Sequence, residues 1–142
     1  MLIHYKKDGI VVFDAPVEKM FRYMSAGGHK HVAFKSHKIV RVSGNVVTLD
    51  AEIYNPDGTT YRTTITHVLN PPKGLETTMT GRPMDGAKFR QTYTPLGDKT
   101  KLDVEGDFPA FPGMSETDEL KMIDGFFTTV FTEDNASLQA IK

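Results

Sequence analysis

Hydrophobic and polar positions alternate along two neighbouring segments in the middle of the chain. Residues 47–53 are apolar at odd positions and polar at even ones, which is the period-two pattern of a half-buried β-strand. Residues 59–69 repeat the alternation after Asn55-Pro56-Asp57-Gly58, whose proline and glycine suit a tight turn. The pattern predicts a β-hairpin. Its returning strand places five side chains on the inward face: Tyr61, Thr63, Ile65, His67 and Leu69.

Five further segments have the character of strands. They lie near residues 4–13, 36–42, 75–81, 87–94 and 99–108, and breaks rich in proline and glycine separate the last three. The last segment alternates most cleanly, with apolar and small residues facing one side and charged residues the other. Short, regular connections favour an antiparallel meander, so we predict a sheet of about seven strands with one solvated face.

Two segments have helical periodicity. The first runs from Pro16 to about Ser25, with apolar residues at the i, i+3, i+4 and i+7 spacing of one buried stripe. The second begins at Ser115, which forms a capping-box-like start with Asp118, and extends for about 25 residues. Its apolar stripe comprises Leu120, Ile123, Phe126, Phe127, Val130, Phe131, Leu138 and Ile141. A stripe this wide is expected to lie against the concave face of the sheet.

Composition narrows the class of protein. The 142 residues contain no linker, repeat or low-complexity stretch, so we expect one α+β domain, residues 1–142. A net charge of −1 without a basic stripe argues against nucleic acid as a partner. There are no cysteines for disulfides or thiolate metal sites. The N-terminal apolar run is too short for a signal peptide, and no segment reaches the roughly 18 apolar residues of a membrane span, so a cytoplasmic protein is expected.

The order of elements, together with two local motifs, resembles the START-like helix-grip (SRPBCC) superfamily. One motif is Val11-Val12-Phe13-Asp14-Ala15-Pro16-Val17-Glu18-Lys19-Met20-Phe21, similar to the first strand and helix start of the family, and the other is the late strand from Gly86 to Thr94. The chain departs from many members by having Gly28-His29-Lys30-His31-Val32-Ala33-Phe34 where they carry a tryptophan-containing segment. The superfamily includes polyketide cyclases/dehydrases, plant pathogenesis-related proteins and lipid-transfer domains.

The resemblance implies a curved antiparallel sheet wrapped around the C-terminal helix, with one or two short helices after the first strand. It also implies a cavity for an apolar or amphipathic small molecule, such as a lipid, quinone, sterol or polyketide. The inward positions support this expectation, because they mix apolar walls with sparse polar groups. The alternative is a filled core whose polar groups bond one another. The predicted ligand contacts are Tyr61, Thr63, His67, Met79, Phe89, Gln91, Tyr93, Phe127 and Val130.

Four histidines raise the question of catalysis or metal binding. His67 is the candidate for chemistry, since an imidazole can orient a carbonyl or transfer a proton; core packing is its alternative role. His29, His31 and His37 are spaced as a metal site could use, but neighbouring lysines oppose a cation and no carboxylate is close in sequence. We therefore interpret these three as surface residues. No metal and no cofactor is expected.

The loop before the last helix is unusually apolar. Phe108, Phe111 and Met114 would be costly to expose, so we expect a lid over the cavity or a contact between two copies of the chain, with local packing as the alternative. Three functions stay open at this point: ligand binding, a cyclase/dehydrase-type enzyme that uses His67 as a proton shuttle, and an interaction module that binds a partner through residues 108–114.

Overall fold

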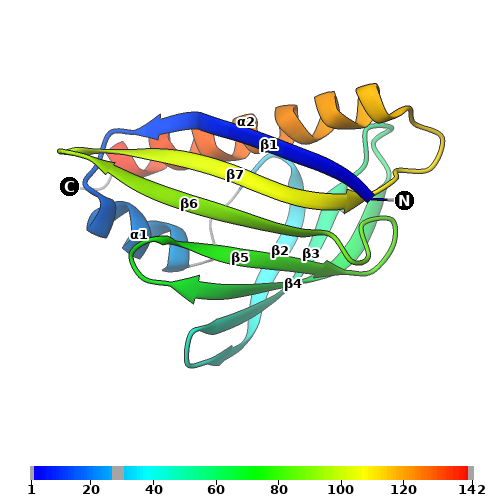
Figure 1. Ribbon diagram of the computed structural model, residues 1–142. Helices are drawn as coiled ribbons and strands as arrows, with labels where there is room; N and C mark the ends of the chain where they lie inside the picture. The colour runs from blue at the N-terminus through cyan, green and yellow to red at the C-terminus, as the bar shows by residue number, and fades with distance from the viewer. Residues whose placement is uncertain (1, 27–30, 141–142) are drawn as a thin grey trace.

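The strands form one sheet in the computed structural model, which describes residues 2–26 and 31–140. The elements in chain order are β1 (Leu2–Phe13), α1 (Val17–Ala26), β2 (Phe34–Ser43), β3 (Val46–Tyr54), β4 (Thr60–Asn70), β5 (Gly74–Thr80), β6 (Lys88–Leu96), β7 (Lys99–Pro109) and α2 (Glu116–Gln139). The seven strands lie in the order β1-β7-β6-β5-β4-β3-β2, and every neighbouring pair is antiparallel. The predicted sheet and both predicted helices are confirmed (Figure 1).

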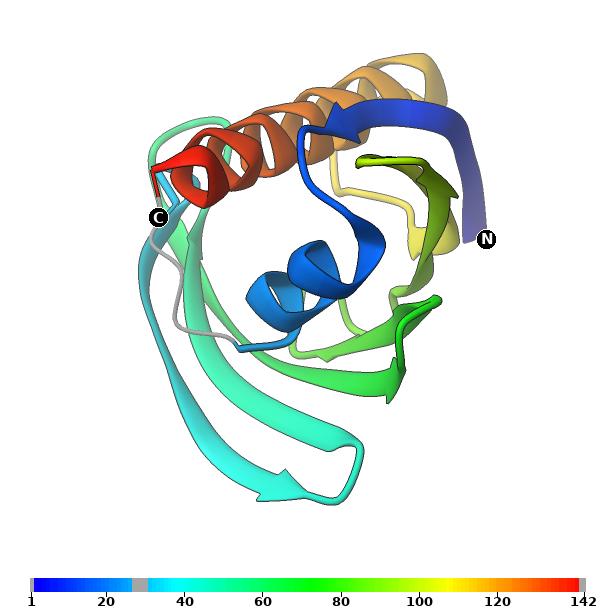
Figure 2. The same ribbon diagram turned by 90° about the vertical axis from the view of Figure 1, so that its left-hand side faces the viewer.

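The sheet curves strongly, and α2 lies along its concave side. Figure 2 shows the strands as an incomplete ring, with α2 along one side and α1 inside one end. The Tyr5 hydroxyl of β1 donates a hydrogen bond to Asp124 of α2 at 2.8 Å. Phe21 of α1 packs edge-on against Tyr93 of β6, with ring centroids 6.2 Å apart. The two helices therefore enclose the space that the sheet curves around.

Local side-chain chemistry sets the two boundaries that the sequence predicted most directly. In the turn between β3 and β4, Gly58 has a φ of 88°, and the Asp57 carboxylate accepts the backbone N–H of Thr59 at 3.0 Å. At the start of α2, the Ser115 hydroxyl accepts the backbone N–H of Asp118 at 3.1 Å. These contacts end one strand pair and begin the long helix at the expected residues.

Strands β6 and β7 approach each other closely at Gly106, and this approach positions the Phe89 side chain on the concave face. Gly106 of β7 pairs with Phe89 of β6, and a Cβ at position 106 would lie 2.5 Å from the Lys88 carbonyl oxygen and 2.6 Å from the Phe89 Cα. No side chain fits at such distances. The space left by Gly106 lets the Phe89 ring stack on Phe108, with centroids 5.8 Å apart and planes 18° apart.

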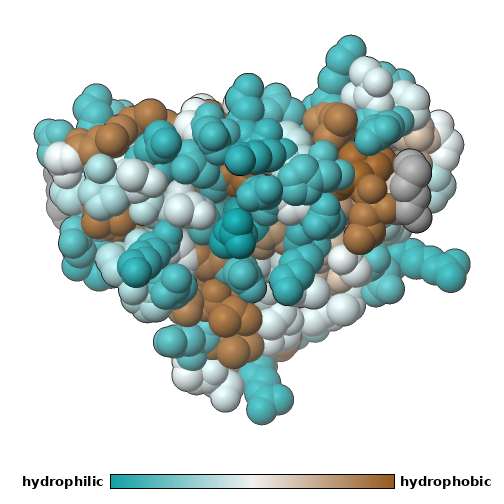
Figure 3. Space-filling model, viewed as in Figure 1, coloured by the Kyte–Doolittle hydropathy of each residue, from teal (hydrophilic) through white to brown (hydrophobic). Residues whose placement is uncertain are grey.

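The outer surface is mostly polar, with separate apolar patches (Figure 3). One patch lies in the lower part of that view, over the β2–β3 hairpin and the adjoining end of β4, where Val42, Val46 and Val68 are exposed. Surface patches of this kind are common at interaction sites. The contact between two copies of the chain, expected at residues 108–114, stays a prediction. Neither helix of residues 2–26 and 31–140 is long and apolar enough to cross a membrane.

Candidate functional site

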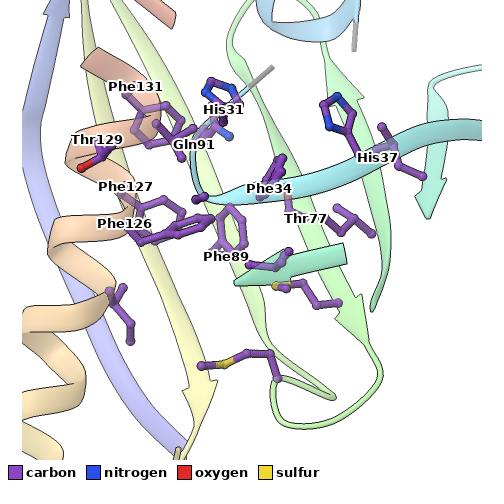
Figure 4. Close-up of a pocket in the computed structure, with 18 of the residues that line it drawn as sticks. His31, Phe34, His37, Thr77, Phe89, Gln91, Phe126, Phe127, Thr129 and Phe131 are labelled. Atoms are coloured by element: carbon purple, nitrogen blue, oxygen red, sulfur yellow. The ribbon is translucent and has the colours of Figure 1, made fainter. Parts of the chain in front are cut away.

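A cavity of about 520 Å³ lies between the concave face of the sheet and α2 (Figure 4). Its volume is within the range of small-molecule binding sites, and its walls are largely aromatic. Seven phenylalanines line it: Phe34, Phe89, Phe108, Phe111, Phe126, Phe127 and Phe131. They come from β2, β6, β7, α2 and the loop before α2, so only the folded chain brings them together.

Phe127 is the centre of this aromatic wall. Its ring meets Phe89 edge-on at 4.9 Å between centroids, and it stacks parallel to Phe131 at 5.6 Å. Phe108 and Phe126 contact it at 6.0 and 5.6 Å. Such edge-to-face and stacked contacts fix the rings in place, so the apolar surface offered to a ligand is preorganised.

Seven of the nine predicted ligand contacts line the cavity: Tyr61, His67, Met79, Phe89, Gln91, Phe127 and Val130. Thr63 and Tyr93 do not line it, although both are buried. The Thr63 hydroxyl donates to the carbonyl of Thr80 at 2.9 Å, which ties β4 to β5. The Tyr93 hydroxyl donates to Gln91 Oε1 at 2.8 Å. Tyr93 therefore orients the Gln91 amide, whose nitrogen remains a donor.

His67 faces the cavity from β4 as a neutral ring. Its Nδ1 lies 2.8 Å from the hydroxyl oxygen of Thr77, the residue opposite it on β5. Burial lowers the pKa of His67 to about 4, so the imidazole is uncharged near neutral pH. Its Nε2 makes no hydrogen bond to any described residue. That nitrogen is available to a polar group of a ligand.

Tyr61 supplies a second neutral polar group on the same strand. Burial raises the pKa of its hydroxyl to about 12, so it is a phenol rather than a phenolate. The hydroxyl forms no hydrogen bond within the described ranges. Together with His67 and Gln91, Tyr61 gives the apolar cavity three uncharged groups able to orient a ligand.

The interpretation of His31 as a surface residue is wrong. Its side chain is only 6% exposed and lies between two neighbouring carboxylates of α2. Nδ1 is 3.0 Å from Glu133 Oε1, and Nε2 is 3.1 Å from Asp134 Oδ1. Both His31 and Asp134 line the cavity. The sequence offered one signal for this site: Asp134 occupies the inward stripe of α2 between Phe131 and Leu138, where a carboxylate is unexpected.

The remaining histidines have separate environments. His37 also lines the cavity, and its ring meets Phe34 at 5.5 Å between centroids (Figure 4). His29 lies outside the described residues. His4, on the outer face, contacts Glu105 at 3.1 Å and Asp107 at 2.9 Å on β7, and hydrogen bonding to Asp107 raises its pKa. Over residues 2–26 and 31–140, no group of three or more acidic and histidine side chains is placed to hold a metal ion.

The three predicted lid residues occupy different positions. Phe108 is not in the loop; it belongs to β7, where strand alternation turns it inward, and it is part of the cavity wall. Phe111 lines the cavity from the loop, and Met114 lines a neighbouring hollow of about 430 Å³. The backbone N–H of Phe111 donates a hydrogen bond to the carboxylate of Glu119. This contact joins the loop to the first turn of α2.

Glu119 lies in the first turn of α2, where an acidic side chain complements the helix dipole, and it also holds the preceding loop. Its side chain is fully buried, and burial raises its pKa. Its second carboxylate oxygen, Oε2, has no hydrogen-bond partner among the described residues. The buried carboxylate is a structural feature that joins the loop to the helix.

No family model and no curated protein matches this chain. Solved structures do match along nearly its whole length. A START superfamily protein from Mycobacterium smegmatis superposes with a TM-score of 0.82 at 15% identity, over 99% of each chain. The Zhui aromatase/cyclase from a Streptomyces species gives 0.64 at 13% identity, over 98% of this chain and 89% of the other.

A third match is the di-domain aromatase/cyclase StfQ of the steffimycin biosynthetic pathway, with a TM-score of 0.72 at 14% identity. It covers 97% of this chain, which spans 50% of the length of StfQ. Likeness at this level of identity concerns the backbone: a curved antiparallel sheet, a short helix after the first strand and a long C-terminal helix. The chain therefore has the START-like helix-grip fold.

Proposed function

We propose that this protein binds an apolar or amphipathic small molecule, of a lipid, quinone, sterol-like or polyketide-like class, in the cavity between the sheet and α2. The observation that carries the proposal is a space of about 520 Å³ whose phenylalanine walls include neutral polar groups with free bonding capacity. A filled core would have satisfied His67 Nε2 and the Tyr61 hydroxyl internally, because unpaired buried polar groups are costly. A ligand would satisfy them instead.

The properties of His67 support binding over proton transfer. A general base works best when its pKa is near the working pH, and burial lowers the pKa of His67 to about 4. Its contact at Nδ1 is the Thr77 hydroxyl rather than a carboxylate that would raise its basicity. A hydrogen bond from or to a ligand carbonyl or hydroxyl is the role that suits such a ring.

The proposal is tested with N-phenyl-1-naphthylamine, an uncharged fluorophore whose emission rises in apolar surroundings. We expect saturable binding of one probe per chain and its displacement by lipids or polyketide-like aromatics. Organic extraction of the purified protein, followed by mass spectrometry, identifies any molecule that it carries. A protein that shows no saturable probe binding and carries no extractable molecule would refute the proposal.

A pair of variants at Gly125 links binding to this cavity. Gly125 borders the cavity on α2, and a Cβ there would meet no atom within 4 Å. Because Gly125 is exposed where it borders the cavity, we expect the indole of Gly125→Trp to lie across this border and weaken probe binding by about tenfold or more. Gly125→Ala is the matched control: it adds only a methyl group and stabilises an exposed helical position by about 1 kcal/mol, so affinity is unchanged.

A further inference from the structure

One end of the cavity holds a buried group of charges. His31 lies between Glu133 and Asp134, with each ring nitrogen about a hydrogen-bond length from one carboxylate: 3.0 Å for Glu133 and 3.1 Å for Asp134. Glu133 is 29% exposed, whereas Asp134 is 3% exposed and lines the cavity. Figure 4 shows His31 beside the α2 side of the cavity, away from His37. The group thus extends from the surface to the cavity wall.

This group carries more negative than positive charge. The His31 ring hydrogen-bonds Glu133 through Nδ1, and its Nε2 lies 3.1 Å from Asp134, an arrangement of two neighbouring carboxylates that favours the charged imidazolium form. Burial opposes that charge, but the hydrogen bonds and charges of Asp134 and Glu133 outweigh it and raise the pKa of His31. One imidazolium between two carboxylates leaves a net charge of −1. Within the described part of the chain, Asp134 forms no ion pair with a second cation.

Asp134, which lines the cavity, has an incomplete set of hydrogen bonds. Its Oδ1 contacts His31 but accepts no hydrogen bond of normal geometry. The phenols Tyr93 and Tyr23 also interact with it electrostatically. The Tyr93 hydroxyl is already used, since it donates to Gln91. A buried carboxylate with an incomplete set of donors is destabilising until another donor approaches it.

We propose that Asp134 anchors the polar end of the ligand, so that the cavity selects apolar molecules carrying a hydrogen-bond donor, an ammonium or a hydroxyl group, and rejects those ending in a carboxylate. This inference rests on the proposed binding function. A donor completes the hydrogen bonding of Asp134, and an ammonium also neutralises the excess charge. A ligand carboxylate would meet a like charge in a site that excludes water, which is unfavourable.

The test compares three ligands with the same apolar body: decylamine, 1-decanol and decanoate. Each displaces N-phenyl-1-naphthylamine from the wild-type protein at neutral pH. We expect decylamine and decanol each to bind about tenfold or more tightly than decanoate. Equal affinities, or tighter binding of decanoate, would overturn the inference while the probe itself still bound; absence of probe binding would instead overturn the proposed function.

Three variants locate the selectivity. Asp134→Asn is expected to reduce the preference for decylamine over decanoate to about threefold or less. Glu133→Gln keeps the shape of a more exposed side chain and removes the excess charge, so the preference for decylamine over decanoate falls. Glu116→Gln, at an exposed position at the start of α2, removes the same charge outside the group and serves as control.

The ratio of two affinities in one variant does not depend on the fraction of folded protein. Probe binding reports the cavity of each variant independently. If Asp134→Asn does not fold, the test rests on Glu133→Gln. An unchanged preference of that variant for decylamine over decanoate would contradict the inference. A preference that falls equally in Glu116→Gln would assign selectivity to the general charge of the protein and would also contradict it.

Discussion

The neutral state of His67 makes the stability of the protein depend on pH in a way that one substitution should remove. The folded protein holds this imidazole in the cavity wall with a pKa of about 4, against an ordinary value of 6.5. Protonation would place an unpaired positive charge in the largely apolar cavity wall. His67→Gln keeps a polar side chain that can bond the Thr77 hydroxyl, but it does not titrate.

The size and sign of the effect follow from the two pKa values. As the pH falls, the imidazole of the unfolded chain is protonated before that of the folded protein. The contribution of His67 to the free energy of unfolding is therefore complete above pH 6.5 and is lost as the pH falls toward 4. The full difference corresponds to about 3 kcal/mol. Between about pH 7.5 and about pH 4.5 the wild type should lose about 2–3 kcal/mol through this group. His67→Gln should not show that loss.

Urea unfolding, followed by circular dichroism, measures the free energy of unfolding of both proteins at each pH. Other groups also titrate: the lowered pKa values of Asp14 and Glu52 reduce stability in acid, and the raised pKa of His31 opposes this. These contributions are common to both proteins, so they cancel in the difference. A difference between wild type and His67→Gln that stays constant with pH would refute the argument that His67 is buried and neutral.

Two other changes test how the cavity wall is built. Gly106→Ala should destabilise the protein by about 1–3 kcal/mol and weaken probe binding, because the new methyl group overlaps Phe89; an unchanged unfolding midpoint would contradict this packing. Glu119→Ala removes the acceptor of the Phe111 N–H, so amide exchange at Phe111 should accelerate by about tenfold or more, whereas Glu116→Ala should leave it unchanged. Equal exchange rates in the two variants would show that Glu119 does not hold the loop.

Most of the fold was predictable because the signals that define it are local. Strand alternation, the Asn55-Pro56-Asp57-Gly58 turn and the Ser115 cap each act within a few residues, and all lie where predicted. The inward face of β4 followed from the same alternation, so Tyr61 and His67 were placed on the cavity side correctly. Periodicity could not distinguish residues that line the cavity from residues packed in the core behind it. Thr63 was therefore predicted as a ligand contact, like Tyr61 and His67, although its hydroxyl bonds the Thr80 carbonyl.

Contacts between distant segments were decided only by tertiary structure. His31 and Glu133 are separated by 102 positions, and no local pattern links them; the lysines around His31 in the sequence pointed instead to solvent. Glu119 looked like an ordinary acidic residue of a first helical turn until the loop brought the Phe111 N–H to it.

The sequence by itself determined which residues form strands and helices and which face of each is apolar. The closure of the sheet around α2 decided the depth of each side chain, its partners and hence its charge state. The physical reason is that alternation and capping depend on neighbours along the chain, whereas desolvation and ion pairing depend on whatever the fold brings near. His67 therefore became a neutral ring and His31 a paired one, a difference that no neighbour along the sequence indicates.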